Sequence, residues 1–137
     1  MIQNLDASAL RAALLYAALL ILLLLPLTAA VIARRFGRKI GIGDGGDREM
    51  ARWVRVHGNF AETAPFGIAA LFALAFSGAG PLLVHAVGAC FLAGRLAHAQ
   101  GLSSSAGASP GRTAGMVLTL SALAVAALAV LWRVAFA

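Results

Sequence analysis

Polar side chains recur at helical spacing on an otherwise apolar segment of this sequence. Arg52, Arg55, Asn59 and Glu62 fall at offsets of 0, 3, 7 and 10 residues. At 100° per residue their directions span about 80°, so they form one narrow stripe on a helix. Ionisable groups on apolar helices are costly unless they have partners, and they therefore mark candidate functional sites. Cations gathered on such a stripe indicate a site for an anionic ligand.

A second polar pair lies on the next apolar segment. Arg95 and His98 share a helix face, and Arg95 reaches a depth similar to that of Glu62 if the two segments run antiparallel. We therefore predict an ion pair between Arg95 and Glu62. One interpretation is a structural pair that joins the two helices. The other is the floor of a positively charged cavity that includes further polar residues, namely Arg34, Arg35, Arg55, Asn59, His98 and Arg112.

Arg112 and Thr113 come directly before the last apolar run of the chain. If a helix begins here, its positive N-terminal end adds to the charge of Arg112 in favouring an anion. The hydroxyl of Thr113 can donate a hydrogen bond to the same anion. The alternative is that Arg112 only anchors the end of a cytoplasmic loop.

The elements that must position these residues are membrane-spanning helices. Of the 137 residues, 61% are hydrophobic and 12% are charged, and the mean hydropathy is +0.90. A soluble domain of this length has too much surface to hide so many apolar side chains, so lipid must cover the excess. We expect one all-α domain over residues 1–137, an integral membrane four-helix bundle with spans at about 9–33, 54–76, 81–102 and 113–132.

Short sequence signals separate these spans. The glycine-rich segment 41–46 cannot be a regular helix. Asp47 is expected to cap the second helix, with Glu49 in its first turn. Pro81 suits the first turn of the third helix. The segment 103–111, rich in Ser, Gly and Ala, is expected to form a second loop.

The basic residues are distributed as membrane topology signals. Most of them lie between the first two spans, the loop after the third span leads to Arg112, and the turn between the second and third spans carries no charge. The positive-inside rule then places both basic loops in the cytoplasm and both termini outside. The net charge of +6 does not indicate a nucleic-acid partner, because the basic stretch lacks stacking aromatics. Three scattered histidines predict no metal site.

Three motifs resemble those of the MAPEG family, the membrane-associated proteins in eicosanoid and glutathione metabolism. The first is the run RVHGNFAE at 55–62, followed by Pro65, and the second is GRLAHAQG at 94–101. Arg112 stands where the family has a catalytic arginine, and Thr113 stands where some members have serine. Two departures from the eicosanoid enzymes are Gly58, in place of a second arginine of one subgroup, and Leu102, in place of a pocket tyrosine.

This resemblance implies a homotrimer, most similar to short bacterial members of the family and thus expected in a bacterial inner membrane. Glutathione would bind between neighbouring subunits near the cytoplasmic face, and Arg112, with Thr113 beside it, would activate its thiol. The second substrate would be a lipophilic small molecule that arrives through membrane lipid. The residues that the resemblance assigns to the glutathione pocket are Arg34, Arg35, Arg55, Asn59, Glu62, Arg95 and His98.

Two functions from different classes follow. The first is a glutathione-dependent transferase or peroxidase, because several arginines and one Glu match the two carboxylates and one ammonium of glutathione. The second is a small non-catalytic membrane module or a transporter, in which a carboxylate inside the membrane exchanges protons for cationic amphiphiles. Arginines around the cavity disfavour a carrier of cations, so the enzyme is the first hypothesis.

The loop charges predict the orientation of the chain. A reporter that is active only outside the cytoplasm should be active when it is fused to the C-terminus, because both basic loops are expected to be cytoplasmic. A reporter that requires the cytoplasm, fused at the same position, is the control and should be silent. Activity of that second reporter would overturn the predicted topology.

Overall fold

The computed structural model describes residues 6–105 and 107–136, and within them the chain folds into four long helices. These are α1 (Ala7–Arg38), α2 (Arg48–Phe76), α3 (Pro81–Ser104) and α4 (Pro110–Phe136). All four are long and apolar enough to span a membrane. The all-α architecture and the four predicted spans are therefore confirmed, and each helix extends beyond its predicted apolar run.

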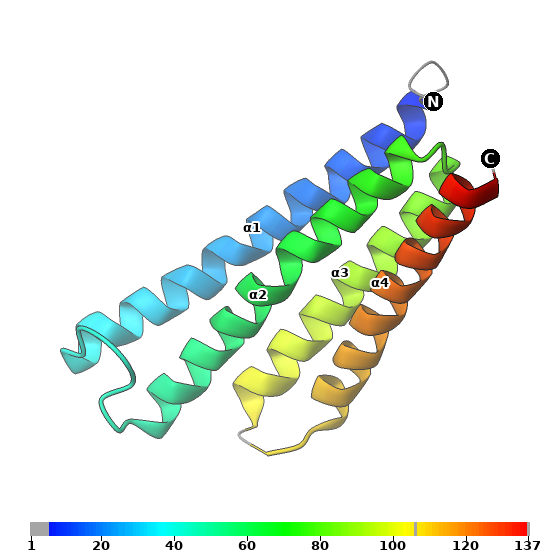
Figure 1. Ribbon diagram of the computed structural model, residues 1–137. Coiled ribbons are helices and arrows are strands. Elements are labelled where there is room, and N and C mark those ends of the chain that lie inside the picture. Colours follow the sequence, from blue (N-terminus) through cyan, green and yellow to red (C-terminus); the bar gives the residue numbers. More distant parts are fainter. Residues whose placement is uncertain (1–5, 106, 137) are drawn as a thin grey trace.

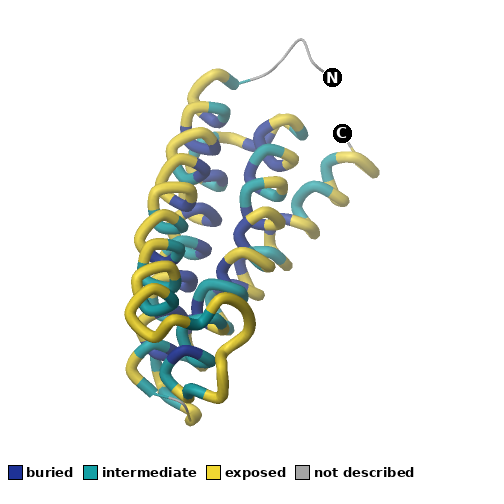
Figure 2. The backbone as a smooth tube through the Cα atoms, turned by 90° about the vertical axis from the view of Figure 1, so that its left-hand side faces the viewer, coloured by how far each residue is buried: buried dark blue, intermediate teal, exposed yellow. Residues whose placement is uncertain are grey.

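The helices run up and down, so the two basic connections lie at one end of the bundle and both termini lie at the other (Figure 1). α1 packs on α2 and α3, and α2 also packs on α4. Buried backbone positions face the interior, while long stretches of each helix are exposed on the outside (Figure 2). Large exposed side chains such as Leu22, Leu82 and Leu128 lie on this outer surface. A bilayer is the solvent that such a surface requires.

Local signals set the helix ends as the sequence predicts. The Asp47 side chain accepts a hydrogen bond from the Met50 N–H at 2.7 Å and caps α2, with Glu49 in the first turn. That N–H, together with the guanidinium of Arg38, holds the pKa of the Asp47 carboxyl below its usual value. Pro81 occupies the first turn of α3. The second loop is shorter than predicted, because α3 continues to Ser104 and α4 begins at Pro110.

Two histidine side chains connect α1 to its neighbours, one from a partly buried position and one from an exposed position. Nε2 of His57 on α2 lies 3.1 Å from the Thr28 hydroxyl of α1. Nδ1 of His85 on α3 lies 3.3 Å from the Tyr16 hydroxyl, and the two rings meet edge to face. Both histidines therefore have a structural role, because polar side chains that hydrogen-bond across two helices help to hold a membrane bundle together.

Glycines bring α3 and α4 into close contact at the end that carries the second loop. A Cβ added at Gly115 would lie 2.4 Å from the backbone N of His98, and one added at Gly101 would lie 2.4 Å from the backbone N of Arg112. A Cβ at Gly94 would meet the Gly115 carbonyl oxygen at 2.9 Å. Small residues at such contacts let two helix backbones approach each other.

This contact generates a stability prediction. Gly115→Ala should lower the free energy of unfolding by about 2 kcal/mol, because backbone atoms of α3 cannot move aside as a flexible side chain could. The matched control is Gly58→Ala, where the added Cβ would meet only the Glu62 carboxylate at an ordinary 3.8 Å. Helix propensity should make that change neutral or stabilising by up to about 1 kcal/mol. Thermal unfolding in detergent checks both, and equal effects would contradict the close contact.

Candidate functional site

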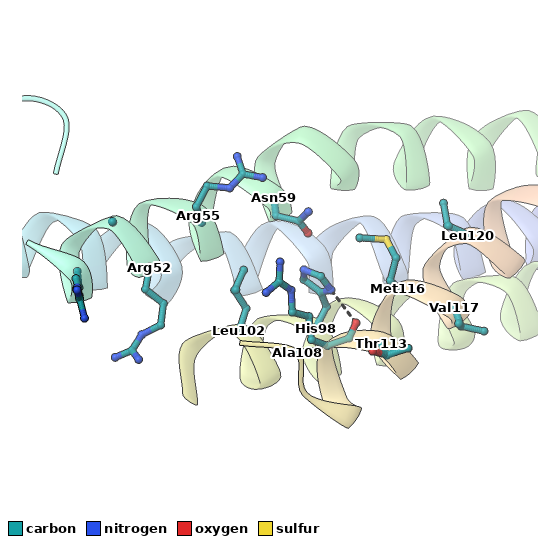
Figure 3. A pocket seen from close by; sticks show the side chains of 13 residues that line it. Arg52, Arg55, Asn59, His98, Leu102, Ala108, Thr113, Met116, Val117 and Leu120 are labelled. Atoms are coloured by element: carbon teal, nitrogen blue, oxygen red, sulfur yellow. Dashed lines mark hydrogen bonds between the residues drawn. The ribbon is translucent and has the colours of Figure 1, made fainter. Parts of the chain in front are cut away.

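A groove with a volume of about 850 Å³ opens beside the lower halves of α2, α3 and α4, near the second loop. This volume lies within the range of roughly 300–1,000 Å³ that is typical of small-molecule sites. Figure 3 shows Arg52 and Asn59 from α2, His98 from α3 and Met116 from α4 around it. The full lining consists of Arg48, Ala51, Arg52, Arg55, Asn59, His98, Leu102, Ala108, Arg112, Thr113, Met116, Val117 and Leu120.

The groove is positively charged. Of the described residues that line it, four are arginines and none carries a carboxylate. The arginines come from two elements, with Arg48, Arg52 and Arg55 on the first turns of α2 and Arg112 on the first turn of α4. Guanidinium groups are always charged and bind carboxylates in a planar, two-point manner. The arrangement therefore suits an anionic ligand with more than one acidic group.

A buried arginine lies behind the groove wall. Arg95 is fully buried, and its Nη2 donates a hydrogen bond to Oδ1 of Asn59 at 2.7 Å. Its Nε and Nη1 are also buried and have no hydrogen-bond partner among the residues that the structure describes. A buried cation held by one neutral amide still favours a negative charge nearby. Arg95 thus reinforces the preference of the adjacent groove for an anion.

The predicted ion pair between Arg95 and Glu62 is wrong. Glu62 is 63% exposed, and its Oε1 lies 3.6 Å from Nη1 of Arg55, which is equally exposed. Three residues on a helix correspond to a rotation of 300°, so Glu62 points about 60° away from Asn59. Because Asn59 faces α3 and contacts Arg95, Glu62 turns to the outer flank of α2. Exposed charges at 3.6 Å contribute little to stability.

His98 and the start of α4 are joined by a hydrogen bond. Nδ1 of His98 lies 3.1 Å from the backbone carbonyl oxygen of Arg112 (Figure 3). A carbonyl oxygen only accepts, so Nδ1 carries the proton and donates it, and a neutral ring keeps its lone pair on Nε2. His98 is buried. This bond holds the first turn of α4, and with it Arg112, in a defined place beside α3.

Arg112 and Thr113 both lie on the groove, as expected for residues that act together. Arg112 is the third residue of α4, and its Nη1 donates a hydrogen bond to the Gly107 carbonyl oxygen at 3.4 Å. Thr113 is exposed on the lining. Both residues belong to the first turn of a helix, where the helix dipole favours an anion. Their backbone N–H groups donate to Ser109, that of Arg112 to the hydroxyl and that of Thr113 to the carbonyl oxygen.

Two predicted pocket residues, Arg34 and Arg35, lie elsewhere on the same chain. Nε of Arg34 pairs with Oε1 of Glu49 at 3.2 Å, and its guanidinium lies 3.9 Å from the centroid of the Trp53 ring. Arg35 lines a separate hollow at the end of α1. Neither is among the residues that line the groove of this chain. They sit at the end of α1, and α2 separates them from the loop that leads to α4 (Figure 1).

Arg48 and Arg52 are lining residues that the sequence analysis did not assign to the site. Arg52 belongs to the polar stripe, and Arg48 precedes it by one helical turn. Nε of Arg52 is buried without a hydrogen-bond partner in the described part of the chain. Their spacing from Arg55 and Asn59 was a usable signal. Basic residues next to a span are, however, usually topology signals, and this second explanation of the same pattern hides the signal for a site.

Two substitutions on α2 distinguish the observed hydrogen bond between Arg95 and Asn59 from the ion pair between Arg95 and Glu62 that the sequence predicts. Asn59→Leu should destabilise the protein by about 2–4 kcal/mol, because it removes the observed acceptor of a buried cation. Glu62→Gln, one turn away on the same helix, is the matched control. It should change stability by less than about 0.5 kcal/mol, since both partners are exposed. A larger loss from Glu62→Gln than from Asn59→Leu, by unfolding in detergent, would contradict this geometry.

Comparison with known proteins places these features in a family. The MAPEG family model matches residues 13–132, which include parts of all four helices and the whole groove lining. The inner membrane protein YecN of Escherichia coli K12 is 36% identical over 118 residues, which cover 86% of this chain and 88% of that protein. YecN of Escherichia coli O6:H1 matches with the same values. This chain belongs to the MAPEG family.

Proposed function

We propose that this protein is a glutathione-dependent membrane transferase or peroxidase that acts on a lipophilic electrophile. The observation that carries the proposal is the groove itself, with four arginines and no carboxylate among its described lining residues, in a chain of the MAPEG family. Glutathione carries two carboxylates and one ammonium group, so this excess of guanidinium groups suits it.

The donor set of the groove fits the polar groups of glutathione. Arg48, Arg52 and Arg55 offer guanidinium groups to the carboxylates, with Asn59 and the buried Arg95 behind them. Glu62 does not line the groove, but it pairs with Arg55, which does, and it is the acceptor that we assign to the ammonium group. The unpartnered Nε of Arg52, which lines the groove, is consistent with a ligand that brings a further acceptor.

Bound glutathione supplies a thiol that adds to an electrophilic carbon or reduces a peroxide. We assign Arg112 to the stabilisation of negative charge on the sulfur. A free thiol has a pKa of about 8.5, and lowering it by about two units takes some 2.7 kcal/mol of differential interaction. A permanent guanidinium charge at the start of α4, added to the helix dipole, can provide this. Thr113 adds a hydroxyl donor, and His98 positions both by holding the Arg112 carbonyl oxygen.

The lipophilic substrate has an apolar route into the same groove. Met116, Val117 and Leu120 continue the lining along α4 toward the middle of the bundle. Val117 and Leu120 are each 58% exposed, so this end of the groove faces the bilayer in a membrane-embedded chain. We therefore propose that the substrate enters from the lipid.

The transporter alternative is less well supported by the geometry. A proton-coupled carrier of cations needs its carboxylate inside the cavity. Glu62 instead lies on the outer flank of α2, paired with Arg55, and is not among the residues that line the groove.

Assembly and location belong to the same proposal. Membership of the MAPEG family supports a homotrimer with glutathione between neighbouring subunits, where Arg34 of one chain would serve the groove of the next. Arg35 lines a separate hollow. The name of the YecN relative supports an inner-membrane location.

The role of Arg112 is tested by the ultraviolet absorption of the thiolate. Wild-type protein saturated with glutathione at neutral pH should show this absorption, and Arg112→Leu should abolish it. Calorimetric titration should show that the same variant weakens glutathione binding only modestly, about tenfold or less, because the carboxylate contacts lie with other arginines.

The matched control is Arg48→Leu, which removes an arginine from the far end of the same groove. It should weaken binding while leaving the thiolate absorption of the saturated protein intact. The catalytic role of Arg112 is wrong if the wild-type protein binds glutathione without a thiolate, or if the thiolate persists in Arg112→Leu.

A further inference from the structure

The end of α1 carries four cations that fall into two classes. Arg34 and Arg38 are paired with carboxylates at the start of α2, because both contact Glu49 and Arg38 also contacts Asp47. Arg35 and Lys39, on the same two helical turns, form no ion pair with any residue in the described ranges. Two of the four positive charges at this end are therefore left for a partner outside the chain.

These two cations line one hollow. Its volume is about 460 Å³, and its walls are Ile32, Arg35, Phe36, Lys39, Ile40 and Gly41. Nη1 of Arg35 donates a hydrogen bond to the Ile40 carbonyl oxygen at 3.4 Å, which holds the guanidinium against the loop. The hollow thus combines two positive charges with three apolar side chains, a combination suited to a ligand that has an anionic and an apolar part.

The last turn of α1 holds Lys39 in an unusual conformation. Lys39 has a φ of 55°, the left-handed conformation that helix ends usually reserve for glycine. Its backbone N–H closes the helix on the Arg35 and Phe36 carbonyl oxygens. Glycines stand two residues away on either side, at positions 37 and 41. A glycine would adopt this conformation with less strain, but the position carries a lysine, and this lysine lines the hollow.

The hollow lies at the depth of lipid headgroups. Residues 12–33 carry no charge and cover about 33 Å as a helix, enough to cross the roughly 30 Å of hydrocarbon. Arg35 and Lys39 follow directly. Phe36 beside them is 81% exposed, and Ile42 in the loop is 91% exposed. Exposed apolar side chains next to cations at this depth suit insertion at the boundary between headgroups and acyl chains.

We propose that this hollow, the α1-end site, binds the headgroup of an anionic phospholipid. Arg35 and Lys39 contact the phosphate, and Ile32, Phe36 and Ile40 contact the upper part of the acyl chains. Juxtamembrane cations attract anionic lipid in this manner, and here two of them converge on one hollow instead of facing solvent separately. The site lies on the opposite side of α2 from the second loop (Figure 1), so its occupancy does not depend on the proposed enzyme activity.

Native mass spectrometry of the detergent-solubilised full chain tests the proposal. Protein doped with phosphatidylglycerol should retain bound lipid, and protein doped with phosphatidylethanolamine should retain much less. The double variant R35Q/K39Q should weaken phosphatidylglycerol binding by about thirtyfold, because each juxtamembrane cation strengthens lipid binding by a similar factor and the two factors multiply. Excess inorganic phosphate should not displace the lipid, because the apolar side chains also hold it.

The matched control is R11Q/R133Q, which removes two positive charges at the other end of the bundle and should leave phosphatidylglycerol binding unchanged. The lipid site is refuted if R35Q/K39Q keeps wild-type retention, if both lipids are retained equally, or if free phosphate displaces the lipid completely. A loss of oligomer mass or of glutathione binding in R35Q/K39Q, with lipid retention intact, would show instead that a second copy of the chain covers the hollow.

Discussion

The contact between α3 and α4 is the constraint on which the groove depends. Gly101 and Gly115 let the two backbones approach so closely that a single methyl group at either position would collide with a main-chain nitrogen. This approach brings the buried ring of His98 to the carbonyl oxygen of Arg112. It thereby places the start of α4, with the charge of Arg112, beside the polar stripe of α2.

The small number of carboxylates limits how many cations of this protein can form ion pairs within the chain. The chain has 11 basic and 5 acidic residues, so some cations must lack an acidic partner. Asp47 and Glu49 neutralise Arg34 and Arg38 and hold the first connection against the bundle. Arg55 of the groove pairs with the exposed Glu62. The other arginines of the groove and the two cations of the α1-end site form no ion pair within the described part of the chain. The two ligands that we propose, one soluble and one a lipid, are both anionic and would use that excess.

The burial of Arg95 illustrates how a membrane bundle tolerates a charge. Its guanidinium is fully buried, and Asn59 provides a neutral acceptor on one side only. A neutral acceptor satisfies one N–H group without cancelling the positive charge. The charge therefore remains available to the neighbouring groove, which a buried ion pair with Glu62 would have prevented. Glu62, the partner that the sequence suggested, lies on the outer flank of α2 and pairs with Arg55.

The sequence by itself determined the four helices, their caps and the gathering of polar residues near one end of the bundle. Hydrophobic runs of membrane length, Asp47 as a cap and Pro81 as a helix start are local signals that need no tertiary information. It also brought Arg55, Asn59, His98, Arg112 and Thr113 together as candidates, through helical spacing and through the resemblance to the MAPEG family, and all five line the groove. Only the tertiary structure decided which side of each helix faces which neighbour. A difference of 60° around α2 separates Asn59, which meets Arg95, from Glu62, which does not, and a sequence stripe about 80° wide cannot resolve that difference. The same holds for Arg34 and Arg35, adjacent in sequence, where a rotation of 100° turns one toward Glu49 and the other into a separate hollow.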